Sequence, residues 1–130
     1  MKNKIKKRVF YAQAVYGEDE INAVNNVLIN SSNMLMDNIK VREFEEKISS
    51  IFGKKYGLMV NSGSSANLLA VSSLNLSKGS EVITPALTFS TTVAPIIQNG
   101  LVPAFVDIDL QSFNINTNLI EEMIGEKTKA

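Results

Sequence analysis

The most informative segment is Val60-Asn61-Ser62-Gly63-Ser64-Ser65-Ala66-Asn67-Leu68, where an apolar run gives way to small polar residues and then to a helical pattern. Residues 56–60 are apolar or aromatic and follow a Gly-Lys-Lys turn, so we expect them to form a short buried strand. The apolar residues that come next recur at helical spacing. They predict a helix over residues 64–76, with Ser64 or Ser65 as its N-cap.

A turn of this kind between a strand and a helix can bind an anion. The first N–H groups of a helix have no acceptor within the helix, and the positive end of the helix dipole lies at the same place. Phosphate is therefore one expected ligand of the Gly-Ser-Ser turn. An ordinary turn that binds nothing needs the same residue types, and neither G-x-G-x-x-G nor G-K-[ST] is present. Both interpretations stay open on the local pattern.

The N-terminal part of the sequence predicts two helices and no strand. The first starts at Gly17, with acidic residues in its first turn, and ends near Asn30. The second runs from Lys40 to Phe52, with Gly53 as its C-terminal stop. The residues expected to face inward are Ile21, Val24, Val27 and Leu28 in the first helix, and Val41, Phe44, Ile48 and Ile51 in the second.

Strands and helices alternate in the rest of the chain. The expected elements are a strand at 81–84 ending at Pro85, a helix from Thr91 or Thr92 to Asn99-Gly100, a strand at 102–106, a helix near 118–124 and the start of another strand at 127–130. Pro95 sets the start of the helix before Asn99, because proline is tolerated in a first turn but not deeper. Alternation predicts an α/β fold with a mostly parallel sheet, flanking helices and right-handed crossovers.

The domain organisation follows from how little sheet these elements provide. Three short parallel strands would leave the faces and edges of their sheet uncovered, which parallel sheets rarely tolerate. We therefore expect residues 1–16 to be an N-terminal arm and residues 17–130 to be an incomplete domain of a larger fold. Five basic residues lie in the arm, namely Lys2, Lys4, Lys6, Lys7 and Arg8. They are expected to be solvated, with contact to an anionic ligand as the alternative.

Composition excludes several classes of function. The 13 basic and 13 acidic residues cancel, so no overall charge favours nucleic acid. No apolar run approaches the roughly 20 residues that span a bilayer. The absence of His removes Ser-His and Cys-His catalytic pairs and every His-ligated metal site, and no metal site is nominated. The absence of Cys fits a reducing compartment such as the cytoplasm.

Ligands of open α/β sheets bind beyond the C-terminal ends of the strands. In this chain that edge consists of loops 61–66, 85–91 and 107–114, none of which contains a lysine. Phe89 lies on this edge, where it could pack against the neighbouring helix or stack on a planar cofactor. Asp107 and Asp109 could serve a metal or acid–base chemistry. We expect them instead to cap a turn, and do not nominate them.

Taken together, these segments resemble the N-terminal part of the DegT/DnrJ/EryC1/StrS family, which comprises sugar aminotransferases and related fold-type-I enzymes that use pyridoxal 5'-phosphate (PLP). The resemblance covers nearly the whole chain in the right order. The matching stretches are Val41-Arg42-Glu43-Phe44-Glu45, Lys55-Tyr56-Gly57, Val60-Asn61-Ser62-Gly63-Ser64-Ser65-Ala66, Glu81-Val82-Ile83-Thr84-Pro85, Thr88-Phe89, Phe105-Val106-Asp107-Ile108-Asp109 and Lys127-Thr128-Lys129-Ala130.

The resemblance implies specific cofactor-binding residues. Gly63, Ser64 and Ser65 would hold the cofactor phosphate, mainly through main-chain N–H groups, and Phe89 would stack on the pyridine ring. It also implies that the catalytic Lys or His and the carboxylate that pairs with the pyridine nitrogen lie beyond Ala130. No catalytic residue is therefore assigned to these 130 residues, which we expect to be inactive alone and to bind PLP poorly.

The sequence departs from the commonest pattern of the family in two places. The cradle is Gly-Ser-Ser-Ala-Asn rather than the common Gly-Thr-Ala, and the loop Met34-Leu35-Met36-Asp37 lacks the usual glycine. Residues 62–68 and 91–101 look more like the 3-dehydratases, which use pyridoxamine 5'-phosphate (PMP) on a 4-keto-6-deoxy sugar nucleotide for lipopolysaccharide and deoxysugar biosynthesis. This branch implies a reductase partner, and the family implies a homodimer. A sugar-nucleotide aminotransferase is the alternative, and a non-catalytic module binding a phosphorylated ligand is the alternative from another class.

Overall fold

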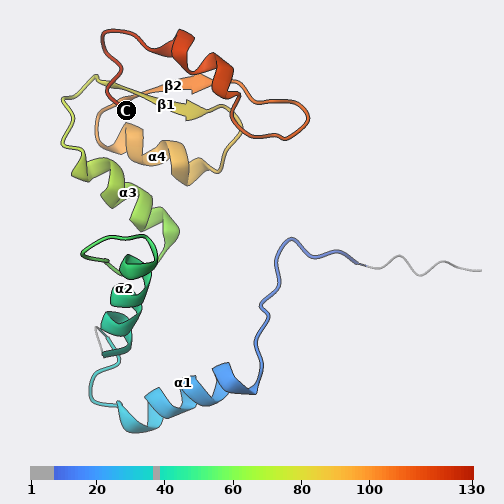
Figure 1. Cartoon of the computed structure of the whole chain (residues 1–130), viewed down its shortest axis with the longest axis vertical. Coiled ribbons are helices and arrows are strands. Elements are labelled where there is room, and N and C mark those ends of the chain that lie inside the picture. The colour runs from blue at the N-terminus through green and yellow to red at the C-terminus, as the bar shows by residue number, and fades with distance from the viewer. Residues whose placement is uncertain (1–7, 37–38) are drawn as a thin grey trace, which may run out of the picture. The chain divides into compact units, whose positions relative to one another are not determined.

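The computed structural model of the chain describes residues 8–36 and 39–130, coloured from blue to red along the chain in Figure 1. The predicted features at Lys2, Lys4, Lys6, Lys7 and Asp37 lie outside the described residues. The chain divides into two compact units, one ending at Met59 and one formed by Val60–Ala130, and each is described by itself. No helix in the described ranges is both long and apolar enough to cross a membrane.

The first unit contains the two predicted helices, α1 (Glu18–Asn30) and α2 (Ile39–Ile51). The Gly17 N–H donates to Glu20 Oε2 at 2.7 Å, and this bond closes the N-terminus of α1 and lowers the pKa of Glu20. After α2 the backbone of Gly53 turns with φ 61°, a conformation that favours glycine. The predicted C-terminal stop at Gly53 is therefore confirmed.

The predicted inward face of α2 is wrong. Of the four residues expected to face inward, Val41 is half-buried but Phe44, Ile48 and Ile51 are exposed, and the buried residue of the helix is Ser49. The reason is that the chain turns back over a polar face of α2, where residues 55–57 lie beside Glu45 and Ser49. The turn starts at the C-terminus of the helix, where the Lys54 N–H donates to the Ser49 carbonyl at 2.8 Å. The stripe on α1 is similarly exposed at Ile21, Val24 and Leu28.

The strand expected at residues 56–60 is also absent. This segment follows α2 backwards, and the Met59 N–H donates to Glu45 Oε1 at 2.6 Å rather than to a neighbouring strand. The approach is close, because a Cβ added to Gly57 would lie 2.6 Å from the Glu45 carbonyl oxygen. A glutamate side chain therefore takes a donor that a sheet ladder would have used.

The second unit is built on a parallel sheet. Strand β1 (Glu81–Pro85) pairs with β2 (Val102–Val106), with Glu81 opposite Val102. On the other side of β1, Glu81 forms a parallel bridge with Thr128, and the Ile83 N–H donates to the Ala130 carbonyl at 2.9 Å. The predicted parallel sheet and the predicted approach to a further strand are confirmed, and β1 lies between its two neighbours.

Helix α4 (Ser90–Gln98) connects β1 to β2 and covers one face of the sheet, as Figure 1 shows. Its Ile96, only 2% exposed, packs with Val82 and Leu101 to form the core of the unit, and Val71 and Leu76 pack against this core. The helix begins one residue before the earliest predicted start, so Pro95 is its sixth residue and is buried. The stop at Asn99-Gly100 is confirmed, with Gly100 at φ 72°.

Two other predicted helices differ from those observed. Helix α3 (Gly63–Ser73) starts earlier and ends earlier than 64–76, because Asn75 adopts a left-handed φ of 49° that ends helical geometry. The helix predicted near 118–124 is replaced by two 3₁₀ turns, η1 (Thr117–Leu119) and η2 (Glu121–Met123). The chain must reach Lys127 at once to pair with β1, which leaves too little length for an α-helix to propagate.

Candidate functional site

The N-terminus of α3 is held by a chain of short polar contacts. The Ser65 N–H donates to Ser62 Oγ at 3.2 Å, so Ser62 is the N-cap and the predicted cap at Ser64 or Ser65 is wrong. Ser62 Oγ donates to Ser65 Oγ at 3.1 Å, and Ser65 Oγ donates to Asn61 Oδ1 at 2.7 Å. The cap rule identifies Ser62 once the helix is known to begin at Gly63, because an extended residue with a hydroxyl precedes the first turn.

Two amides of this first turn remain available to a ligand. Within the described ranges, the N–H groups of Gly63 and Ser64 have no acceptor, whereas the Ser65 N–H is occupied by the cap. The side chain of Ser64 is exposed. A Cβ added to Gly63 would meet no atom within 4 Å, so the space beside these amides is open. The donor set of free amides, hydroxyl and helix dipole suits a phosphate group.

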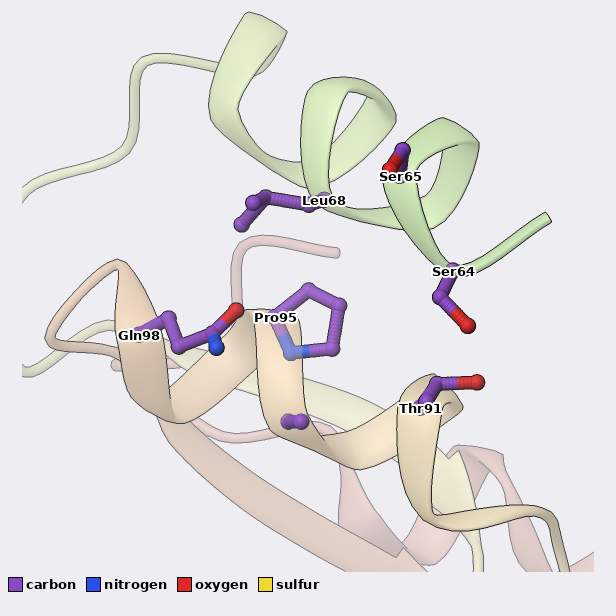
Figure 2. Close-up of a pocket in the computed structure, with 7 residues that line it drawn as sticks. Ser64, Ser65, Leu68, Thr91, Pro95 and Gln98 are labelled. Carbon is purple, nitrogen blue, oxygen red and sulfur yellow. The ribbon is translucent and has the colours of Figure 1, made fainter. Parts of the chain in front are cut away.

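Helices α3 and α4 run in the same direction and enclose a groove with a volume of about 170 Å³. Figure 2 shows Ser64 facing Thr91 at one end of the groove and Leu68 facing Pro95 further along. Two hydrogen bonds join the helices, from Asn67 Nδ2 to the Thr91 carbonyl at 3.3 Å and from Ser72 Oγ to Asn99 Oδ1 at 2.9 Å. The first turns of both helices are thereby brought side by side.

Phe89 lies at the N-cap position of α4 without a side-chain capping bond. Its ring is 67% exposed and does not line the groove, although Thr91, two residues further on, does. The interpretation of Phe89 as an ordinary packing residue is not favoured by this exposure. The structure thus brings Ser64 and Ser65 to the groove together, and places Phe89 exposed at the start of the helix that faces them.

Asp109 caps a turn, as expected from its position after a strand, whereas Asp107 accepts only the N–H of the next residue. Asp107 Oδ1 accepts the Ile108 N–H at 2.7 Å, and Asp109 Oδ1 accepts the N–H groups of Ser112 at 2.8 Å and Gln111 at 3.1 Å. The bond from the Ser112 N–H is the main reason why the pKa of Asp109 is lowered. No cluster of three or more His, Cys, Asp or Glu residues suited to a metal exists among the described residues.

Acidification should weaken the turn that Asp109 caps. Because the pKa of Asp109 is lowered on folding, its contribution to stability is present above the pKa of the unfolded chain and is lost as pH falls through the folded value, that is, below about pH 4. We expect Asp109→Asn to lower the thermal midpoint at neutral pH and to make the midpoint less sensitive to acid. Unfolding scans of both proteins between neutral and acidic pH test this, and parallel pH curves would contradict it.

Asn67 is the residue that sequence reasoning missed. Its side-chain amide donates to the Thr91 carbonyl of α4. A signal was present in the sequence: a proline inside a predicted helix leaves the carbonyl four residues earlier without its usual donor, so a neighbouring amide becomes valuable there. The partner itself could not be read from the sequence, because Asn67 and Thr91 are 24 positions apart.

Comparison with known proteins decides the family. The sequence profile of the DegT/DnrJ/EryC1/StrS aminotransferase family matches residues 14–130. The chain belongs to this family. The chain is also similar to the GDP-4-keto-6-deoxy-D-mannose 3-dehydratase of Yersinia pseudotuberculosis, with 41% identity over 125 residues, covering 92% of this chain and 31% of that protein. The chain therefore spans less than a third of this relative's length.

Similar solved structures confirm the predicted α/β fold. The GDP-4-keto-6-deoxy-D-mannose 3-dehydratase of Escherichia coli, solved with bound hydrated PLP, matches with a TM-score of 0.82 and 38% identity over 91% of this chain and 31% of that one. A protein of Streptococcus pneumoniae described as a sugar aminotransferase, solved in PLP and PMP forms, matches with a TM-score of 0.81 and 29% identity over 93% of this chain and 30% of that one. The predicted family and fold class are thus both confirmed.

Proposed function

We propose that the chain forms the phosphate-binding part of a PLP- or PMP-dependent enzyme that acts on a nucleotide-linked 4-keto-6-deoxy sugar. The observation that carries the proposal is the pair of free amides at Gly63 and Ser64, in a chain that belongs to a family with PLP-bound members. Two relatives are named as 3-dehydratases of GDP-4-keto-6-deoxy-D-mannose, which favours the dehydratase branch. The site would serve in lipopolysaccharide or deoxysugar biosynthesis.

Each proposed contact uses a group that the structure leaves accessible. The Gly63 and Ser64 N–H groups would donate to phosphate oxygens, reinforced by the dipole of α3. The Ser65 N–H would become a further donor if the Ser62 side chain rotated away from it. A phosphate oxygen would then replace Ser62 Oγ as the acceptor of this N–H group. The exposed ring of Phe89 would lie against the pyridine.

The cofactor, when bound, supplies an electron sink for chemistry next to the sugar ketone. The residues of this chain bind its phosphate and orient its ring, and none of the three loops at this edge supplies a lysine to move protons. We therefore propose that the proton-transferring Lys or His, and the carboxylate that faces the pyridine nitrogen, lie outside residues 1–130. On that basis the 130 residues alone are inactive.

Further parts of the proposal concern assembly. We propose a cytoplasmic homodimer, a reductase partner for the dehydratase reaction, and a division of the chain into an arm at 1–16 and part of a PLP-binding large domain at 17–130. The family match over residues 14–130 and the 31% coverage of the Yersinia pseudotuberculosis relative support the division of the chain, whereas the homodimer, the reductase partner and the location are what the resemblance to the family implies.

The alternative function, a sugar aminotransferase, is favoured by the Streptococcus pneumoniae match. The sugar product distinguishes it from a 3-dehydratase. We would incubate the full-length protein with PLP, glutamate and GDP-4-keto-6-deoxy-D-mannose and analyse the sugar by mass spectrometry. Loss of the 3-hydroxyl as water indicates the dehydratase, and replacement of the keto oxygen by an amine indicates the aminotransferase. A full-length protein that binds neither PLP nor PMP would refute both and leave the non-catalytic module.

Phe89→Ala should weaken cofactor binding without unfolding the protein. The ring is 67% exposed, so its removal leaves no cavity in the core. Loss of one aromatic stacking contact should raise the PLP dissociation constant roughly three- to tenfold. Fluorescence titration of the full-length variant measures this, with Phe89→Tyr as the control that keeps the ring. Equal affinity in Phe89→Ala and the parent would remove the stacking role.

A further inference from the structure

We propose that Asn67 is a positioning residue that holds the phosphate-binding end of α3 in register with the end of α4 that carries Phe89. The inference rests on the proposed cofactor site. It assigns to Asn67 no contact with the cofactor, because its amide is directed at the main chain of α4. Asn67 would instead fix the distance between the free amides at the start of α3 and the Phe89 ring at the start of α4.

The hydrogen bond from Asn67 exists because of Pro95. In an α-helix the carbonyl of residue 91 accepts the N–H of residue 95, but proline has no N–H to donate. The Thr91 carbonyl therefore lacks its usual donor, and Asn67 Nδ2 donates to it at 3.3 Å. Pro95 itself is buried and lines the groove between the helices, so the proline that frees the carbonyl also packs where α3 approaches.

The location of this bond gives it a role that the second bond between the helices lacks. Asn67 is one turn beyond Gly63 and Ser64, and Thr91 is two residues beyond Phe89. The bond between Ser72 and Asn99 joins the opposite ends of the same helices at 2.9 Å. If only the bond near the site is removed, α3 stays attached at its far end while the amides and the aromatic ring lose their fixed separation. Figure 2 shows how the labelled side chains of α3 and α4 face each other along the groove.

Substitutions at Asn67 and Pro95 distinguish two roles of Asn67. One is to hold α3 and α4 in register, and the other is only to donate a hydrogen bond to the Thr91 carbonyl. In the full-length protein, Asn67→Leu removes the donor, and Pro95→Ala restores an N–H that bonds the Thr91 carbonyl within α4. We expect Asn67→Leu to lower the thermal midpoint in the parent and to lower it less in the Pro95→Ala background. We expect the PLP dissociation constant to rise roughly three- to tenfold with Asn67→Leu in both backgrounds, because the α3–α4 tether is lost in each.

Ser72→Ala is the matched control, since it removes a bond between the same helices at the far end. It should lower the thermal midpoint and leave PLP affinity unchanged. Unchanged PLP affinity in Asn67→Leu would overturn the inference, and so would full recovery of affinity in Asn67→Leu/Pro95→Ala. Failure of the proposed function appears differently, as an unsubstituted protein that does not bind PLP, and it would overturn the inference as well.

Discussion

Ser64→Pro should abolish most of the affinity for PLP while the protein remains folded. The substitution removes one of the two free amides at the start of α3. Ser64 is the second residue of that helix, where proline is tolerated because the N–H has no intrahelical acceptor. A hydrogen bond to a charged phosphate contributes about 1.5–3 kcal/mol, so the dissociation constant should rise roughly ten- to hundredfold. Fluorescence titration of the full-length variant with PLP measures the change.

Ser64→Ala is the control that keeps the amide and removes only the hydroxyl. We expect it to bind PLP more tightly than Ser64→Pro does, since the main chain is proposed to supply the stronger contact. Pyridoxal, which lacks the phosphate, should bind Ser64→Pro and the parent protein equally. If Ser64→Pro keeps the parent's PLP affinity, with circular dichroism showing an intact fold, the anion cradle is not where we place it.

Local sequence patterns predicted the strands of the second unit, although not its helix bounds or the 3₁₀ turns at 117–123. Both strands, the stop at Asn99-Gly100 and the approach to a further strand at residues 127–130 were confirmed. These segments are bounded by residues with strong backbone preferences, such as Pro85 after a short β-branched run. Their apolar residues also have partners within the same unit, namely the core around Ile96. Pattern and burial therefore agree there.

The first unit shows where pattern alone fails. The stripe of Phe44, Ile48 and Ile51 has the spacing of a buried helix face, yet these side chains are exposed. Periodicity records that a face is apolar but not which surface covers it. Residues 56–60 have strand-like composition, but a strand also needs a neighbour with which to form hydrogen bonds. The side chain of Glu45 took the Met59 N–H instead, and no local rule indicates such a partner.

The sequence located the candidate site but did not fix the roles of its residues. Ser64, Ser65 and Phe89 were expected at the ligand-binding edge from their position, whereas their roles toward the cofactor, and that of Gly63, came from the resemblance to the family and stay predictions. The sequence does not indicate which of their N–H groups are free, because this depends on which side-chain oxygen caps the helix. Ser62 Oγ occupies the Ser65 N–H and leaves the Gly63 and Ser64 N–H groups free. A difference of one residue in the helix start thus decides which amides can meet a phosphate.

Gly57→Ala should destabilise the protein more than any other single methyl group added at a glycine of the described chain. A Cβ at this position would lie 2.6 Å from the Glu45 carbonyl oxygen and 3.2 Å from the Glu45 Cα and carbonyl carbon. These are main-chain atoms of α2, which cannot rotate aside as a flexible side chain would. Relief requires the segment to move away from α2, which would strain the 2.6 Å bond from the Met59 N–H to Glu45 Oε1. We expect a loss of about 1–3 kcal/mol in the free energy of unfolding.

Gly125→Ala provides the matched comparison, because a Cβ there would meet no atom within 4 Å and the backbone is not left-handed. Chemical denaturation of the two full-length variants should show a lower midpoint for Gly57→Ala and little change for Gly125→Ala. If both keep the parent's midpoint, residues 54–59 do not lie against α2 as described. If both lose stability equally, the effect belongs to alanine replacing glycine in general. A loss confined to Gly57→Ala shows that the missing side chain permits the close approach, in a segment whose composition alone predicted a strand.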